Sequence, residues 1–216
     1  MRASSNWRNA VTVAKPIPIG AKIVDSLPFS QAGTLIQAKA LKAAGAEGVA
    51  LYLGVAKWQE ADECLAAGLG IFGVTIGDHF DGAAAHAQMV ALGMANGTSA
   101  FLDFEGPATL AMTDDECCAK IDAWADKVDP DFLAGMYLAP PQPLTSKLVY
   151  ARPKIRRYWK GGGSLRARNG IDLVEPDCGW CMTQAWPSRM FAGVWVDVDQ
   201  AGEDFHGRSA VWSISA

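Results

Sequence analysis

Short apolar segments alternate with longer amphipathic segments along most of the chain. The apolar segments predict eight strands, over residues 21–25, 48–53, 69–76, 99–105, 132–138, 154–159, 180–185 and 193–199. Helical periodicity between them predicts helices over residues 31–44, 57–67, 81–95 and 113–128. The early strands recur every ~25–30 residues, which is the length of one strand–helix unit.

Local signals support the boundaries of three of these helices. Asp81 stands where it can cap the Ala-rich helix, and Thr113 and Glu116 form the sequence pattern of a capping box. Gly68 follows the second helix at the position where glycine commonly ends one. After residue 138 such signals become rare, and Gly- and Pro-rich loops separate the strands.

Eight strands in this order favour an α/β fold, a (β/α)8 TIM-like barrel with a shortened, helix-poor second half. The competing architecture is an open, doubly wound sheet, but no G-x-G-x-x-G follows the first strand and no P-loop is present. We expect residues 1–20 to form an irregular segment that closes one end of the barrel. Residues 21–216 are expected to form a single domain.

Composition and charge exclude several classes of protein. Of the 216 residues, 50% are apolar and 19% are charged, so the chain can bury a large core and is not intrinsically disordered. No apolar run approaches the ~20 residues of a membrane span. A net charge of −4 without charge blocks argues against a general nucleic-acid binder.

The five cysteines and the N-terminal sequence indicate the cellular compartment in which the protein is made. An odd number of cysteines does not suit the disulfide framework of a small secreted protein. Cys178 and Cys181 have metal or redox spacing, but no second C-x-x-C accompanies them, so we interpret them as reduced thiols, with a zinc site or a redox pair as alternatives. The apolar residues 10–14 are too few for a signal peptide, so we expect synthesis in the cytoplasm without one.

Four acidic residues fall at predicted strand ends: Asp25, Asp103, Glu105 and Asp197. In a barrel, catalytic side chains project from the C-terminal ends of the strands. Asp103 and Glu105 stand two residues apart, so both point to one face, about 6–7 Å apart. Burial and mutual repulsion raise the pKa of at least one such carboxyl. A proton-holding acid beside an ionised carboxylate is what glycoside hydrolysis requires, and solvated strand-end acids are the alternative interpretation.

Further motifs accompany these acids in a fixed order. They are Lys22-Ile-Val-Asp25, Gly-Asp-His79-Phe80, Leu102-Asp103-Phe104-Glu105, Gly135-Met136-Tyr137, Tyr158-Trp159, Thr183-Gln184 and Val196-Asp197-Val198-Asp199. Their order over about residues 21–200 resembles the family 25 glycoside hydrolases (Chalaropsis-type lysozymes). It looks closer still to relatives of that family known only as glycoside-hydrolase-like domains of unknown function.

The resemblance implies hydrolysis of a bacterial cell-wall, peptidoglycan-type polysaccharide by carboxylate acid catalysis. It makes Glu105 the general acid, and Asp103 the carboxyl that orients the substrate or stabilises positive charge at the anomeric carbon. Asp25 and Asp197 would flank the sugar and tune the pKa values. For an N-acetyl sugar the substrate's own acetamido group can act as the nucleophile. No metal or organic cofactor is implied.

Aromatic and amide side chains are expected to line the groove beside these acids. The resemblance and the predicted strand ends make the following residues candidates for substrate binding: Tyr137, Trp159, Gln184, His79 and Trp186. For each of the tryptophans near the groove, including Trp180 and Trp195, packing in the core is the alternative to stacking on a sugar.

The sequence also departs from the family pattern. Ser26-Leu27-Pro28 follows the first acid, Tyr52-Leu-Gly54 lacks the usual Lys, Ala185-Trp186 follows Gln184, and Asp199 stands where Asn is usual. Because these positions line the groove, the alternative is a catalytically weakened protein that binds glycan or serves in an assembly. A phage particle component, carried on a virion or released by lysis, is an example. A third hypothesis is an enzyme of unrelated chemistry on the same barrel.

Overall fold

The computed structural model of the chain describes residues 11–25, 35–76, 80–163, 165, 167 and 169–216. Its strands are β1 (Thr12–Pro16), β2 (Lys22–Asp25), β3 (Gly48–Leu53), β4 (Gly70–Thr75), β5 (Ser99–Asp103), β6 (Leu133–Leu138), β7 (Arg157–Lys160), β8 (Met182–Phe191), β9 (Val194–Ala201) and β10 (Val211–Ser215). Its helices are α2 (Leu35–Ala43), α3 (Trp58–Ala66), α4 (Gly82–Ala91), α5 (Pro107–Leu110), α6 (Asp114–Val128) and α7 (Ser146–Val149).

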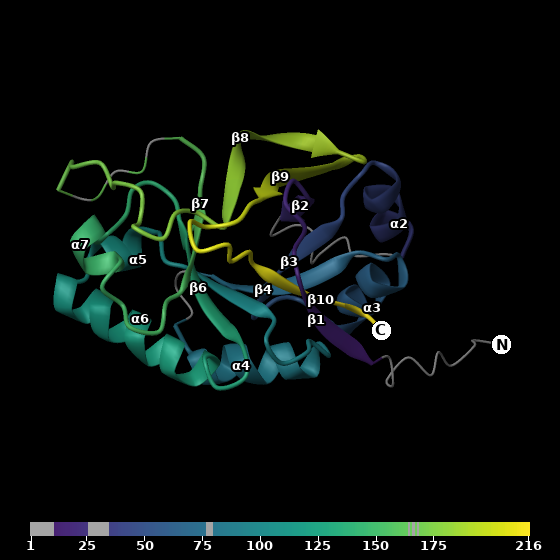
Figure 1. The fold of residues 1–216 in the computed structure, drawn as a ribbon, viewed down its shortest axis with the longest axis horizontal. Helices are drawn as coiled ribbons and strands as arrows, with labels where there is room; N and C mark the ends of the chain where they lie inside the picture. Colours follow the sequence, from purple (N-terminus) through teal and green to yellow (C-terminus); the bar gives the residue numbers. More distant parts are fainter. Residues whose placement is uncertain (1–10, 26–34, 77–79, 164, 166, 168) are drawn as a thin grey trace.

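Strands β2 to β9 close into an eight-stranded barrel (Figure 1). Neighbouring strands from β2 to β8 run parallel. Strand β9 is antiparallel to both β8 and β2 and closes the barrel between them. The predicted TIM-like barrel is confirmed, but its last strand runs in the opposite direction to the others. The cause is the tight turn at Ala192 and Gly193, both with positive φ, which returns the chain directly and leaves no room for a crossover helix.

The second half of the barrel is helix-poor, as predicted. In the first half, Asp81 caps α4 and Thr113 and Glu116 form the capping box of α6. Gly68 follows α3 with a φ of +74°, and α4 ends at Ala91 instead of residue 95 because Gly93 turns the chain away with a φ of +73°. Among the described residues after Val149 there is no helix, so loops cover the outer side of β7 and β8 (Figure 1).

The end of the barrel at which the parallel strands begin is closed by the antiparallel pair of β1 and β10. Trp212 on β10 fills this end, because a Cβ at Gly70 would lie 2.3 Å from its indole and a Cβ at Gly48 would lie 2.7 Å from it. The prediction of an irregular segment over residues 1–20 is therefore wrong for residues 12–16. These residues form a strand because β10 offers them an edge to pair with.

Two hydrophobic clusters lie on the two sides of the barrel wall. The inner one contains Phe72, Phe101 and Trp159, whose rings meet edge to face at centroid distances of 5.5–6.1 Å. The outer one lies under the helices and includes the buried Trp124 of α6. The inner aromatic side chains thus form a solid floor beneath the end of the barrel at which the parallel strands finish, here called the carboxyl end.

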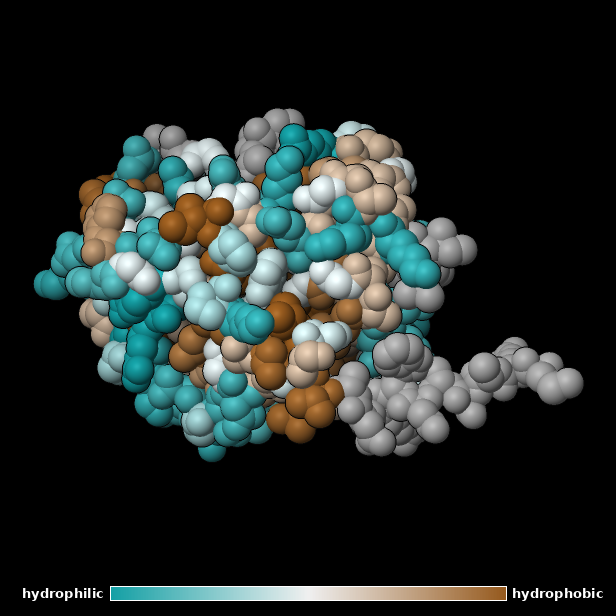
Figure 2. All heavy atoms as spheres, turned by 45° about the vertical axis from the view of Figure 1, so that its right-hand side comes forward, coloured by the Kyte–Doolittle hydropathy of each residue, from teal (hydrophilic) through white to brown (hydrophobic). Residues whose placement is uncertain are grey.

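The surface is mostly polar, with local hydrophobic groups. On the face shown in Figure 2, brown side chains gather in the lower half, beside the grey N-terminal residues. Val11, next to those residues in the chain, is 69% exposed. None of the described helices combines the length and apolar character that a membrane crossing requires.

Candidate functional site

The four predicted acids meet at the carboxyl end of the barrel. Asp25 is the last residue of β2, Asp103 is the last of β5, and Glu105 follows two residues later. Asp197 of β9 stands directly opposite Asp25 in the β2–β9 pair. The charges of Asp25 and Asp197 both raise the pKa of Glu105, which places these carboxyl groups within electrostatic reach of one another.

Asp25 forms the deep end of this cluster. It is 1% exposed, and its Oδ1 accepts a hydrogen bond from the Tyr52 hydroxyl of β3 over 2.9 Å. Burial raises the pKa of Asp25 to about 6, although hydrogen bonds from Asp199 and Tyr52 counteract part of the rise. Asp25 therefore changes its charge in the range of pH in which many enzymes work.

Asp199, a fifth acid, lies beside Asp25. It is also 1% exposed, and the indole Nε1 of Trp159 donates a hydrogen bond to its Oδ1 over 3.0 Å. The two carboxyl groups hydrogen-bond to each other, and the Gln184 side chain also hydrogen-bonds to Asp25. Within the described part of the chain, no N–H or hydroxyl group donates to Asp199 Oδ2. Burial and the charge of Asp25 hold the pKa of Asp199 well above its usual range, so Asp199 carries the proton that the two share.

Asp103 and Glu105 share one face of the chain at the end of β5, as predicted from their spacing. Phe104 between them points the other way and packs on Phe80 at a centroid distance of 5.0 Å. Asp103 is 7% exposed, and burial, followed by the charges of Glu105 and Asp25, raises its pKa well above the usual range. Glu105 is half-buried, and burial is the main cause of its raised pKa. Both carboxyl groups are thus biased toward the protonated form.

Asp197 lies on β9, at the side of the site next to β8. The register of β8 against β9 shifts between Ala185 and Arg189, so Asp197 faces a bulge of β8. The hydroxyl of Ser188 in this bulge donates a hydrogen bond to Asp197 Oδ1. Asp197 is half-buried, like Glu105, and is more accessible than the three buried aspartates.

Tyr137 and Gln184 make the wall of the site between β6 and β8. The Tyr137 hydroxyl donates a hydrogen bond to Gln184 Oε1 over 2.6 Å, and the backbone N–H of Gly162 donates to the same oxygen over 3.4 Å. A Cβ at Gly161 would lie 2.9 Å from the Tyr137 hydroxyl oxygen, so glycine is needed for this close approach. Both side chains are half-buried, in keeping with the prediction that they line the site.

Trp159 differs from the prediction. It is 1% exposed and its ring packs on Tyr137 at a centroid distance of 4.7 Å, so no face of the indole is open for stacking on a sugar. The prediction that Trp159 binds substrate directly is wrong, because the inner side of β7 at this level belongs to the aromatic floor. Trp159 supports the site from below by holding Asp199.

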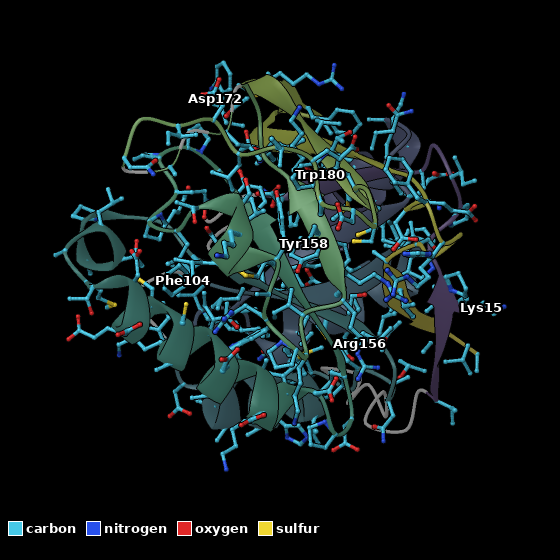
Figure 3. All side chains as sticks on the ribbon, turned by 60° about the vertical axis from the view of Figure 1, so that its left-hand side comes forward. Lys15, Phe104, Arg156, Tyr158, Asp172 and Trp180 are labelled. Carbon is cyan, nitrogen blue, oxygen red and sulfur yellow. The ribbon has the colours of Figure 1, made fainter. Side chains whose placement is uncertain are left out.

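The other predicted aromatic residues lie in different places. Trp180 packs on the outer hydrophobic cluster and contacts Tyr150 with ring centroids 6.5 Å apart. Tyr158, labelled with Trp180 in Figure 3, belongs to the same outer cluster. His79 and the side chain of Trp186 lie outside the described residues. Trp195 is 61% exposed on β9.

Tyr52 and Asp199 were not predicted as site residues. In the sequence, Asp199 differs from the family pattern only as an Asp at a position where Asn is usual. The signal that could have identified it is its spacing of two residues from Asp197, which places both side chains on one face of β9. Tyr52 is brought to Asp25 by the β2–β3 register, in which Asp25 pairs with Ala50, two residues before Tyr52. The sequence gives no direct indication of that register.

The cysteines stand apart from the acids. Cys178 and Cys181 are free thiols, and burial raises the pKa of both, that of Cys181 to about 12. The Cys181 thiol donates a hydrogen bond to the Tyr158 carbonyl oxygen over 3.3 Å. Within the described ranges, no group of three or more His, Cys, Asp or Glu side chains has the arrangement of a metal site.

Two solved structures are similar to this one. The first is GHIP from Streptococcus pneumoniae, a glycosyl hydrolase 25 described as a virulence factor that participates in host cell invasion, with a TM-score of 0.60 and 11% identity over 84% of this chain and 87% of that chain. The chain shares its fold with a glycosyl hydrolase 25. The second is an uncharacterized protein from B. stearothermophilus, with a TM-score of 0.57 and 15% identity over 85% of this chain and 96% of that chain. No family model and no curated protein matches the sequence.

Proposed function

We propose that this protein is a glycoside hydrolase that cleaves the glycan of bacterial cell walls, with Glu105 as the general acid. The observation that carries the proposal is the state of Glu105, a half-buried carboxyl with a raised pKa at the carboxyl end of the barrel. Such an acid holds its proton to a higher pH than a solvated glutamate does and remains open to a substrate, as protonation of a glycoside's leaving group requires. The likeness to a glycosyl hydrolase 25 supports the same reaction class.

The proton of Glu105 passes to the bridging oxygen as the bond between that oxygen and the anomeric carbon breaks. For an N-acetyl sugar, the carbonyl oxygen of the substrate's acetamido group attacks the anomeric carbon and forms a cyclic oxazolinium intermediate. Water then adds to the anomeric carbon, and its proton returns to Glu105. The leaving chain departs with a free hydroxyl, and the cleaved sugar has a new reducing end.

Asp103 suits a role in holding the acetamido group. Its Oδ1 is buried and has no hydrogen-bond partner among the described residues, although a carboxyl oxygen in such a place normally has one. A substrate amide N–H would satisfy this oxygen. Asp25 and Asp197 act at longer range, because their negative charges keep the proton on Glu105.

The experiment compares the release of reducing ends from purified peptidoglycan by the wild type and by Glu105→Gln. We expect release by the wild type and a loss of 10²–10⁴-fold in the variant, the usual contribution of a general acid. Glu203→Gln, at an exposed position after β9, is the matched control and should retain full activity. If the wild type binds peptidoglycan and releases nothing, the glycan-binding alternative replaces hydrolysis.

A further inference from the structure

We propose that Trp195 and Met190 form a platform on which one sugar ring of the glycan stacks, next to the carboxyl cluster. The inference rests on the proposed function and adds a binding subsite to it. The two residues are direct cross-strand partners near the tip of the β8–β9 hairpin. Trp195 is 61% exposed and Met190 is 54% exposed, so neither contributes to the core.

The alternation of β9 places this platform on the same side of the sheet as the acids. Trp195, Asp197 and Asp199 are two residues apart in turn, so their side chains share one face. Ala201 continues this face, and it belongs to the cluster inside the barrel. Val196 and Val198 point the other way and belong to the outer cluster. The platform therefore extends the inner lining of the barrel beyond its mouth.

The spacing of Trp195 and Asp197 along β9 fits a polysaccharide that contacts both the platform and the acids. Two residues of a strand span about 6.6–6.8 Å, so Trp195 lies about one sugar ring beyond Asp197. A sugar ring stacked on the indole would place the next sugar of the glycan over the acids. Figure 1 shows the β8–β9 hairpin rising above the rest of the barrel, where a long substrate can reach it.

The hairpin holds the platform in place. Phe191 and Val194 on its opposite face are partly buried against the outer cluster, and the turn at Ala192 and Gly193 is tight. A hairpin anchored in this way presents the indole at a defined place, and a Trp side chain has only two rotatable bonds to order when it binds a ligand. Trp also suits a ligand that is partly apolar and partly polar, which describes the C–H face and the hydroxyl rim of a pyranose.

The test measures equilibrium binding to insoluble peptidoglycan in the Glu105→Gln background, in which the glycan is not consumed. Trp195→Ala should weaken binding about five- to tenfold, whereas Trp195→Phe should weaken it by about twofold, because an aromatic face remains. The matched control is Trp58→Ala, since Trp58 is 48% exposed on α3, among the helices outside the barrel. Binding by this control should not change. A melting temperature equal to that of the parent shows that each variant is folded, and Met190→Ala provides a second variant of the same platform.

The outcomes separate this inference from the proposed hydrolysis. If the wild type hydrolyses peptidoglycan and Trp195→Ala binds like its parent, the platform is wrong and the proposed function stands. If the wild type hydrolyses nothing but Trp195→Ala weakens binding selectively, the platform stands and the proposed reaction is wrong. Equal weakening by Trp58→Ala, or no binding by the parent, overturns the platform.

Discussion

The indole of Trp159 donates its hydrogen bond to Asp199 in a part of the barrel where both side chains are 1% exposed. Asp199 therefore has one oxygen fixed by the floor of the barrel and the other facing Asp25, with no positively charged neighbour among its described interactions. A carboxyl in this setting behaves as a neutral donor, much like the amide of an asparagine.

Asp199→Asn should stabilise the protein at alkaline pH. The folded state raises the pKa of Asp199, so it retains a proton that the unfolded chain releases above about pH 4. Stability therefore falls as the pH rises from about 4 toward the folded pKa, and an amide removes this dependence. We expect equal stability near pH 4 and a gain of about 1–3 kcal/mol for the variant at pH 8, measured by urea unfolding. Asp177→Asn, at an exposed position, should show the pH dependence of the wild type, and the same curve for Asp199→Asn would contradict the shared proton.

Tyr52→Phe should destabilise the protein mainly above pH 6. The variant loses the hydroxyl that donates to Asp25 Oδ1, and this bond is strongest when Asp25 is ionised, above its pKa of about 6. A hydrogen bond to a charged group contributes about 1.5–3 kcal/mol, so we expect a loss of this size at pH 8 and a smaller one at pH 5. Urea unfolding at the two pH values measures it. A loss that does not depend on pH would mean that the hydroxyl serves packing alone.

Asp197→Asn should move the alkaline limb of the pH–activity profile to lower pH. The proposed reaction requires the protonated form of Glu105, and the negative charge of Asp197 raises the pKa of that carboxyl. Removal of the charge therefore lets Glu105 lose its proton at lower pH. The measurement is the rate of reducing-end release between pH 4 and 9, with Glu203→Gln as the control. An alkaline limb that stays in place would remove Asp197 from the set of residues that tune the acid.

Gly70→Ala should destabilise the closed end of the barrel. The new methyl group would lie 2.3 Å from the Trp212 indole, which β10 holds in place. Overpacking of this kind costs about 1–3 kcal/mol, and we expect the upper part of that range because the neighbour is a rigid ring. Gly202→Ala is the control, since its nearest atoms are 3.9 Å away. Thermal unfolding measures both, and the additional substitution Trp212→Leu should recover part of the loss in Gly70→Ala.

Much of this arrangement could be predicted from the sequence, because local rules decide it. The capping residues Asp81 and Thr113 set the starts of α4 and α6, and the spacing of Asp103 and Glu105 placed both on one face. What could not be predicted depends on the relation between distant strands. The contact of Tyr52 with Asp25 needs the β2–β3 register, and the burial of Trp159 needs the depth of the aromatic floor, neither of which alternation alone reveals.

The antiparallel return of β9 gathers one wall of the candidate site into a continuous stretch of the chain. Residues 182–201 include Gln184, the bulge at Ser188, the exposed Trp195, and both Asp197 and Asp199. In a barrel with crossover helices these side chains would come from separate units. Here a single short gene segment encodes them, and its turn is a place where insertions leave the other six strands of the barrel paired as before. Exchange of this segment between related barrels is therefore a direct engineering route to a different wall of the candidate site.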